Sequence, residues 1–400
     1  MAGTGLGLGV FWFDRIVAGI YSRFRPTLER QIGAVMGRPL ALGPYRGLKA
    51  DGFWIGSSRF LPGPQDSSTA TVEAVRLRID PWASLWLRGP VLDLGLKGAR
   101  ADLRRNARGQ FWVLGSAPPG REPPRIDLRL GLLQPGALRI WGAGATARPL
   151  DLALSGQVGI RLHRRAIDLG LRLAPPAGNG GGSLLVDGGG QWQKQQWQGR
   201  LTARRFPLAS LRSLFPAGDR AGGELAGVAD GRLGLSLNDG LARCDGGLEL
   251  RGLRWQLQTG SLPLTAERLP LSCRERSLIL PASPWRYGTW SGRLTARADT
   301  DRRLDLQLVV QPPPRHPLGR QPLNADLKGR WEAGLLRIAR LDGRLGASTL
   351  RASGGVGRSL ALDARWRLDP DDFPAAAQLP EWLRQPLAGR LRADGRLGAP

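Results

Sequence analysis

Few side chains in this sequence have the type and spacing that catalysis or metal binding requires. His163 lies in RLHRR and His316 lies in PPPRHPLG, and neither has a second metal ligand at a suitable spacing. The acidic pair Asp371-Asp372 precedes Phe373-Pro374, which favours a helix N-cap over an acid–base couple. No nucleophile elbow, phosphate-binding loop or zinc-protease motif occurs. We therefore expect no enzyme, no catalytic or metal-binding residue and no cofactor.

Glycine runs and tryptophans are the next candidates for a binding site. The runs Gly180–Gly182 and Gly188–Gly190 are interpreted as turns, because no helical pattern follows either of them as it would in a phosphate-binding loop. Four tryptophans could stack on sugar rings, although structural tryptophans on sheet faces are the simpler interpretation. These tryptophans are Trp192, Trp197, Trp285 and Trp290.

The chain contains two cysteines, Cys244 and Cys273. Their separation is too large for a CxxC redox motif or half of a zinc site. The spacing favours two unpaired structural cysteines. A single cross-strand disulfide, formed in an oxidising compartment, remains the alternative.

The formal net charge of +25 comes almost entirely from arginine. Three explanations compete: a genome rich in G and C, attraction to anionic lipid headgroups, and nucleic-acid binding. The arginines are scattered over alternate positions, commonly beside Asp, Glu or Gln, and do not form one basic cluster with interleaved aromatics. We therefore expect no nucleic-acid partner.

An alternation of apolar and polar residues, typical of one-sided β-strands, runs from Arg38 almost to the end of the chain. Val75, Leu77 and Ile79 would point to one face, with the intervening Arg76 and Arg78 on the other. The same pattern recurs in many later segments, and its leucines are the candidate lining of an apolar groove. These are Leu128, Leu130, Leu152, Leu154, Leu169, Leu171, Leu233, Leu235, Leu304, Leu306, Leu308, Leu360 and Leu362.

The first residues predict a helix instead. Apolar side chains recur every fourth residue from Trp12 to Met36, and Pro26 should kink the helix. The apolar run at residues 2–13 is too short to cross a bilayer. Two interpretations remain open: the helix caps the end of the sheet, or it is the remnant of a membrane anchor.

Connectors and repeats suggest how the chain is divided. Phe206-Pro207 and Phe373-Pro374 each open a short helical pattern that is followed by new strands, which indicates stacked units. We predict a helix, a β module, a β-sheet unit, a repeat unit and the start of a further repeat. Their ranges are 1–37, 38–115, 116–205, 206–372 and 373–400.

So many strands cannot form a flat open sheet, because sheets of more than about ten strands curl or split. Only a few short helices are available to cover the apolar face. We therefore predict a mainly β fold: an elongated, curled sheet with a groove, an N-terminal helix and a few short helices. Such a groove, aliphatic inside and charged outside, would suit acyl chains.

The segment GRPLALGPYRGLKADGFWIGSSRFLP at residues 37–62 and the strands after it resemble the N-terminal region of TamB-like proteins. These belong to the AsmA-like superfamily, and the cyanobacterial and plastid branch is the most similar. The corner from Arg104-Arg105-Asn106 to Gln110-Phe111-Trp112 also fits, as do the two FP repeats. The resemblance covers about 75 residues in order. The rest of the chain resembles the family only in its general residue pattern.

This resemblance implies a translocation and assembly module in the cell envelope. Such proteins are anchored in the inner membrane by the N-terminus and face the periplasm as a grooved β-structure. They carry phospholipid acyl chains between membranes in outer-membrane biogenesis, and they partner an Omp85-type barrel through a C-terminal domain that is absent here. The ending at GRLGAP suggests a fragment.

We therefore expect an envelope-bridging protein whose groove carries or shields phospholipid. The alternative is a scaffold for the export and assembly of outer-membrane proteins with the Omp85-type partner. A surface that binds polysaccharide through Trp192 and Trp197 is a third hypothesis.

Overall fold

The computed structural model divides the chain into two compact units. Unit 1 is Met1–Arg220 with Leu237–Gly240, and unit 2 is Ala221–Ser236 with Leu241–Pro400. The five-part division expected from the sequence remains a prediction. The structure describes residues 3–64, 66–87, 89–106, 110–113, 127–141, 149–161, 164–176, 181–191, 194, 196–214, 224–238, 241–256, 262–313, 321–332, 335–356, 359–373 and 385–396.

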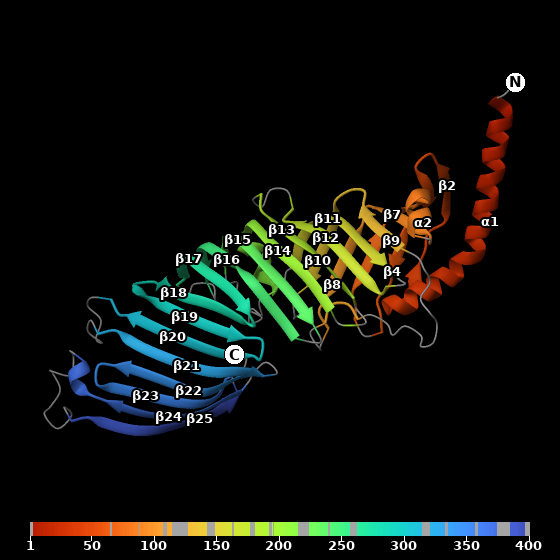
Figure 1. Ribbon diagram of the computed structural model, residues 1–400. Coiled ribbons are helices and arrows are strands. Elements are labelled where there is room, and N and C mark those ends of the chain that lie inside the picture. Colours follow the sequence, from red (N-terminus) through yellow and green to blue (C-terminus); the bar gives the residue numbers. More distant parts are fainter. Residues whose placement is uncertain are drawn as a thin grey trace. The chain divides into compact units, whose positions relative to one another are not determined.

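Unit 1 begins with the long helix α1, Gly3–Met36. Figure 1 shows α1 bent in its C-terminal third, where Pro26 removes a backbone hydrogen bond. The helix stops at Gly37, whose φ of 68° lies in the left-handed region that helix C-termini favour. The N-terminal helix predicted from the sequence is therefore confirmed.

The rest of unit 1 is a sheet with one short helix, α2, Pro81–Leu87. The early strands are β1 (Leu40–Ala41), β2 (Tyr45–Lys49), β3 (Gly52–Ile55), β4 (Ser58–Phe60), β5 (Thr69–Val72), β6 (Ala74–Ile79), β7 (Val91–Lys97), β8 (Arg100–Arg104), β9 (Asp127–Leu132) and β10 (Gly136–Trp141). Four longer strands follow: β11 (Leu150–Arg161), β12 (Ala166–Ala174), β13 (Ser183–Gln191) and β14 (Gln196–Pro207).

The early strands of unit 1 form two panels that share one crease. Five pairs of strands are each one long strand interrupted by one to three residues: β1 and β2, β3 and β4, β5 and β6, β7 and β8, and β9 and β10. Strands β2, β3, β6, β7 and β9 are hydrogen-bonded side by side in one panel, and β1, β4, β5, β8 and β10 in the other. Neighbouring strands are also hydrogen-bonded to each other at the crease, from Gly56 N–H to Pro44 C=O and from Glu73 N–H to Lys97 C=O. The interruptions therefore lie in register, and the sheet is creased rather than broken.

Strand β11 joins the two panels to the later strands. Its residues Leu150–Leu154 pair with β10, and Gln157–Arg161 pair with β9. Gly156 lies between these stretches with a φ of 131°, which residues other than glycine rarely adopt. The opposite edge of β11 pairs with β12 along its length. A glycine bend at the crease thus lets one strand serve both panels.

Unit 2 consists of long strands, and only the last two residues of the first strand, β15, are assigned to unit 1. These strands are β15 (Leu225–Asn238), β16 (Leu241–Trp255), β17 (Leu264–Glu275), β18 (Ser277–Tyr287), β19 (Trp290–Asp299), β20 (Arg303–Gln311), β21 (Leu323–Glu332), β22 (Leu335–Leu345), β23 (Ser348–Val356), β24 (Ser359–Leu368) and β25 (Leu387–Arg396). From β16 to β25 each strand pairs with the next. Register shifts between β18 and β19, and between β21, β22 and β23, mark bulges, which bend strands. Figure 1 shows these strands curving along their length.

Two short 3₁₀ helices complete the described elements: η1, Leu208–Leu214, and η2, Pro370–Asp372. η1 confirms the short helix expected after Phe206-Pro207. Asp369 is the N-cap of η2, whereas the buried Asp372 carboxylate accepts hydrogen bonds from Ala347 N–H and Ser348 N–H. Asp372 therefore bonds the neighbouring hairpin. The helix expected after Phe373 lies outside the described residues.

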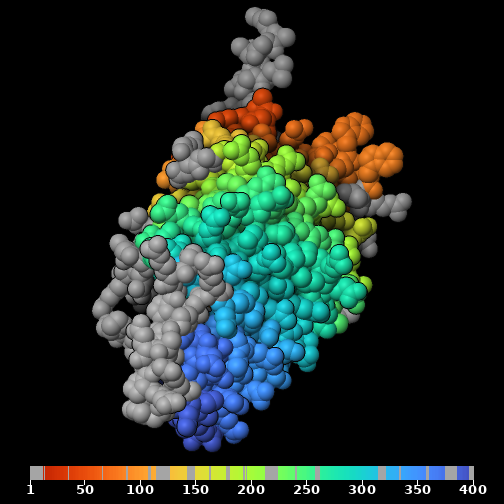
Figure 2. Space-filling model, turned by 90° about the vertical axis from the view of Figure 1, so that its left-hand side faces the viewer, coloured from red at the N-terminus to blue at the C-terminus, as the bar shows by residue number. Residues whose placement is uncertain are grey.

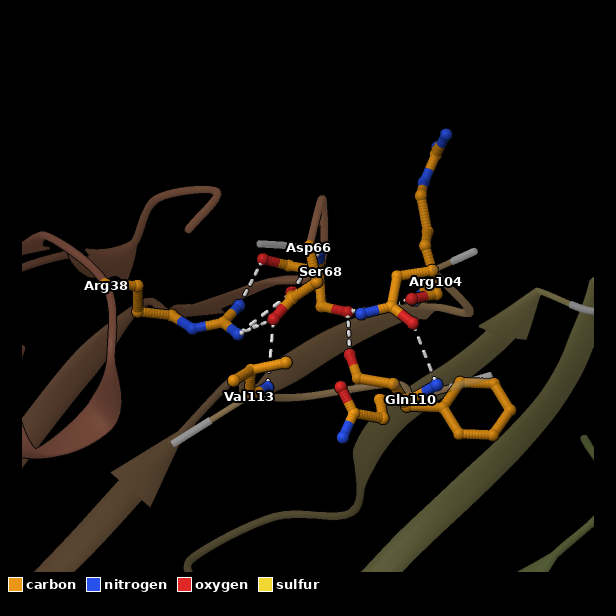
Figure 3. Close-up of polar contacts among 8 residues, drawn as sticks. Arg38, Asp66, Ser68, Arg104, Gln110 and Val113 are labelled. Atoms are coloured by element: carbon orange, nitrogen blue, oxygen red, sulfur yellow. Dashed lines mark hydrogen bonds and ion pairs between the residues drawn. The ribbon is translucent and has the colours of Figure 1, made fainter. Parts of the chain in front are cut away.

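A buried ion pair fastens the end of α1 to the panels (Figure 3). The Arg38 guanidinium donates to both carboxylate oxygens of Asp66 at 2.9 and 2.8 Å, and both side chains are almost fully buried. Asp66 also accepts from Ser68 N–H and Val113 N–H, each at 2.9 Å. The Arg38 guanidinium carbon lies 3.4 Å from the ring centroid of Trp112. Residues far apart in the sequence are thereby held at one corner.

The predicted fold class is confirmed: the fold is mainly β, with a curled and unclosed sheet, an N-terminal helix and few other helices. The physical reason is the long alternation of leucine with charged residues, which favours strands with one apolar face. Glycines and bulges supply the curvature that a flat sheet lacks.

Candidate functional site

The strand register places the leucines of unit 1 on one common face. Leu77 of β6 pairs with Leu94, which pairs with Leu130. Leu130 pairs with Val158 of β11, and Val158 pairs with Leu169. Because directly paired residues project from the same face, this row is continuous across five strands.

Unit 2 has the same arrangement. Leu306 of β20 pairs with Ala296 on one side and with Leu327 on the other. The row continues through Leu341 to the small side chains of β23 and β24, Ala352 and Ala364. A neighbouring row contains Leu304 and Leu362. We call these rows in both units the apolar face.

The side chains of the apolar face are mostly half-buried. Leu152 is 5% exposed and belongs to the core near the crease, whereas Leu235 is exposed. The other predicted lining leucines lie between these limits: Leu128, Leu130, Leu154, Leu169, Leu171, Leu233, Leu304, Leu306, Leu308, Leu360 and Leu362. A sandwich core would bury such residues almost completely. The face therefore retains apolar surface that a ligand can cover.

Tryptophan rings on this face lie close to glycines of the same strand or of the neighbouring strand. A Cβ added to Gly199 would lie 2.1 Å from the Trp197 ring, and one added to Gly188 would lie 2.8 Å from it. Trp285 and Trp366 cover Gly292 and Gly389 in the same way. The run Gly188–Gly190 is thus inside strand β13, not in a turn, and the expectation was wrong because the aromatic ring fills the missing side-chain volume. This contact supports the structural interpretation of Trp197.

Cys244 and Cys273 form a disulfide. The expectation of unpaired cysteines is therefore wrong, and the cross-strand alternative is correct. Cys273 pairs in register with Gly246, two residues from Cys244, so the bond crosses diagonally from β17 to β16. The spacing of 29 residues could not reveal this, because only the hairpin register brings the two Cα atoms to 5.6 Å. Cys273 also pairs with Leu278, which places the disulfide on the apolar face.

The opposite face carries the charged residues in ion pairs. Glu249 accepts from Arg251 at 2.9 Å and from Arg268 at 2.6 Å. Hydrogen bonds from these two arginines lower the pKa of Glu249 to about 2. Arg139 similarly bonds Asp151 at 2.7 Å across β10 and β11. Such exposed pairs are worth little individually, but they identify the water-facing side.

Helix α1 caps the free edge of the sheet with its polar side. The Asp14 carboxylate accepts from Tyr45 O–H at 2.7 Å and from Leu48 N–H at 2.8 Å. Glu29 accepts from Leu42 N–H at 2.8 Å. Burial and then the hydrogen bond to Asp14 raise the pKa of Tyr45. Backbone donors of an edge strand are thus satisfied by helix carboxylates, which protects the edge.

The apolar stripe of α1 remains uncovered. Trp12 is 67% exposed, and the stripe side chains from Ile16 to Ile32 are exposed as well. No helix in the described part of the chain has both the length and the apolar character needed to cross a membrane. The polar side of this helix therefore caps the sheet, and the interpretation of the helix as the remnant of a membrane anchor remains a prediction.

Several sequence candidates do not contribute to this site. His163, His316 and Trp192 lie outside the described residues. Among the described residues, no three His, Cys, Asp or Glu side chains are grouped to hold a metal ion.

Sequence reasoning also missed helix α2. Its signals were present, because Asp80 precedes Pro81 at the positions that N-caps and first helical residues favour.

Comparison with known proteins does not add to this geometry. The chain matches no family model, no curated protein and no solved structure.

Proposed function

We propose that this chain is an envelope-bridging protein that carries or shields phospholipid acyl chains on its apolar face. The observation that supports the proposal is the separation of faces: paired leucines on one side, ion pairs on the other, with the leucines only half-buried. The proposal assigns no catalytic step to the chain, because sliding acyl chains along a surface breaks no covalent bond.

The dimensions of unit 2 suit this role. Strands β16 to β25 pair in succession, and a spacing of about 4.8 Å per strand gives a face roughly 40 Å wide. The hydrocarbon of one bilayer leaflet is about 15 Å thick, half of the bilayer core. An acyl chain would therefore cover only part of the face, and several could lie along it.

Two further observations support placement in the cell envelope. The Cys244–Cys273 disulfide is typical of an oxidising compartment such as the periplasm. The exposed stripe of α1 would lie in the surface of the inner membrane, as amphipathic helices do. Membership of the TamB-like family and an Omp85-type partner are part of the proposal, and they rest on the resemblance at residues 37–114.

Photo-crosslinking at neighbouring residues of opposite faces tests the proposal. A photoreactive amino acid is placed at Leu171 or Leu306, and in control variants at Arg172 or Asp305. We expect phospholipid adducts from the leucine positions only, measured by mass spectrometry after expression in a Gram-negative envelope. Equal lipid capture at all four positions would contradict the proposal. Capture of unfolded outer-membrane proteins without lipid would favour the scaffold alternative.

A further inference from the structure

Helix α2 presents an apolar cluster that no described residue of unit 1 covers. Trp82 is 74% exposed, Leu85 70% and Trp86 84%. These positions are spaced i, i+3 and i+4, so they share one side of the helix. Ile79, at the end of β6, is also exposed. Figure 2 shows orange side chains of this region projecting from the surface. Tryptophan is usually among the more buried residues, so two exposed indoles on one helical turn require an explanation.

The other side of α2 is firmly attached to the sheet. The Asp80 carboxylate caps the helix by accepting from Ala83 N–H at 2.9 Å. Ser84 Oγ donates to the Asp80 backbone carbonyl and accepts from Val91 N–H. Val91 itself is completely buried. The cluster is therefore held outward by a fixed helix.

The cluster borders the apolar face. Ile79 pairs with Leu92 of β7, Leu92 pairs with Leu128, and Leu128 pairs with Ile160 of β11. This row is the last on β6, and α2 starts two residues after Ile79. An apolar row of the sheet thus ends at Ile79, two residues before the helix that carries the exposed indoles.

We propose that α2 is a membrane contact that inserts Trp82, Leu85 and Trp86 into the headgroup–acyl boundary of an anionic bilayer. Indole rings favour this depth because they combine an apolar body with a polar N–H. The chain's net charge of +25 is complementary to anionic headgroups. Because α2 begins two residues after Ile79, this insertion would bring the end of the apolar face close to the acyl chains of that bilayer. This inference does not depend on lipid occupying the face.

Vesicle binding of the full chain provides the first test. Flotation with vesicles of phosphatidylcholine and phosphatidylglycerol is measured for the double variant Trp82→Ser/Trp86→Ser. Removing two interfacial indoles should weaken the apparent affinity by about tenfold or more. Trp54→Ser, which removes an indole that pairs in register with Arg76 on the charged side of unit 1, is the control and should bind within about twofold of the parent.

A photoreactive residue at Leu85 gives a local readout that does not depend on α1 or on the double variant. It should capture vesicle lipid, while the same residue at the exposed Thr71 of β5 should not. Unchanged flotation of the double variant together with no lipid adduct at Leu85 would overturn the inference, as would a protein adduct there in cells. A probe at Leu171 in the same vesicles separates the two proposals, because lipid at Leu171 without lipid at Leu85 would leave the proposed function intact.

Discussion

The Arg38–Asp66 pair has an energetic role that a surface ion pair cannot have. Both side chains are removed from water, and every oxygen of the Asp66 carboxylate accepts hydrogen bonds. A buried charge costs several kcal/mol when it loses its partner, because the remaining ion stays desolvated. The pair therefore joins the end of α1 to residues 66–68 and 111–113, and loss of either partner should destabilise this whole corner.

Replacing Arg38 with methionine should destabilise unit 1 by about 3–5 kcal/mol, since the Asp66 carboxylate would stay buried without its counter-ion. Urea unfolding followed by circular dichroism measures the change. Arg139→Met, which removes an exposed ion pair, should cost no more than about 1 kcal/mol. Equal losses for both variants would contradict this account.

The same site should make unit 1 sensitive to acid. Burial raises the pKa of Asp66, but hydrogen bonds from Val113, Ser68 and Arg38 outweigh it and hold the pKa below the ordinary 3.8. The stability that this carboxylate contributes is complete above its unfolded-state pKa and is lost as the pH falls toward the folded-state value. Asp66→Asn should therefore reduce the fall in unfolding free energy below about pH 4. A parallel pH dependence in the parent and the variant would exclude Asp66 as the responsible group.

Among the secondary-structure elements, the curvature of the sheet depends on a few bent positions within the strands. Gly156 lies where β11 passes from one panel to the other, and a Cβ there would lie 2.1 Å from the Gly170 carbonyl oxygen. Its positive φ adds a second obstacle to any side chain. Gly131, in the neighbouring strand β9, has open space around its Cα and no such φ.

We expect Gly156→Ala to cost about 2–3 kcal/mol through backbone strain and the clash, whereas Gly131→Ala should change stability by less than about 0.5 kcal/mol. Chemical denaturation of both variants measures the difference. A similar loss from both glycines would indicate that general strand propensity, and not the crease, limits substitution.

In unit 2, the Cys244–Cys273 disulfide links the adjacent strands β16 and β17. Reduction, or the variant Cys244→Ser/Cys273→Ser, should lower the unfolding free energy by about 3–4 kcal/mol, as expected for a closed loop of this length. Thiol alkylation followed by mass spectrometry should find no reactive cysteine before reduction. Two alkylated cysteines in the protein isolated from cells would contradict the oxidised state.

At the scale of the whole molecule, function is proposed to reside in a face and not in a pocket. No single residue is then indispensable. Replacing two paired leucines of one row with polar residues should, however, interrupt the apolar face. Leu306 and Leu327 pair across β20 and β21, and the neighbouring pair Asp305 and Lys328 points to the opposite face.

Transfer of a fluorescent phospholipid between vesicles should fall by about tenfold or more in Leu306→Gln/Leu327→Gln, because each buried CH₂ contributes about 0.8 kcal/mol to acyl contact. The matched variant Asp305→Asn/Lys328→Gln should transfer lipid at the parent rate. If the two variants behave alike, transfer does not use this face.

Much of the architecture could be predicted from residue alternation. The outward charges of Arg76 and Arg78, and the one-sided leucines of β20, follow directly from a period of two. The exposed indoles of α2 and the disulfide could not be predicted in this way. Both depend on which segments become neighbours, and local alternation carries no information about partners that are distant in sequence.

Residue alternation alone specifies that this chain forms strands with one apolar and one charged face, since side-chain direction in a strand depends only on position parity. How those faces continue from strand to strand, where glycines bend the sheet and how a polar helix side closes its edge follow only from the folded chain. Those properties arise from cross-strand register and from hydrogen bonds between distant residues, such as Asp14 with Leu48 and Arg38 with Asp66.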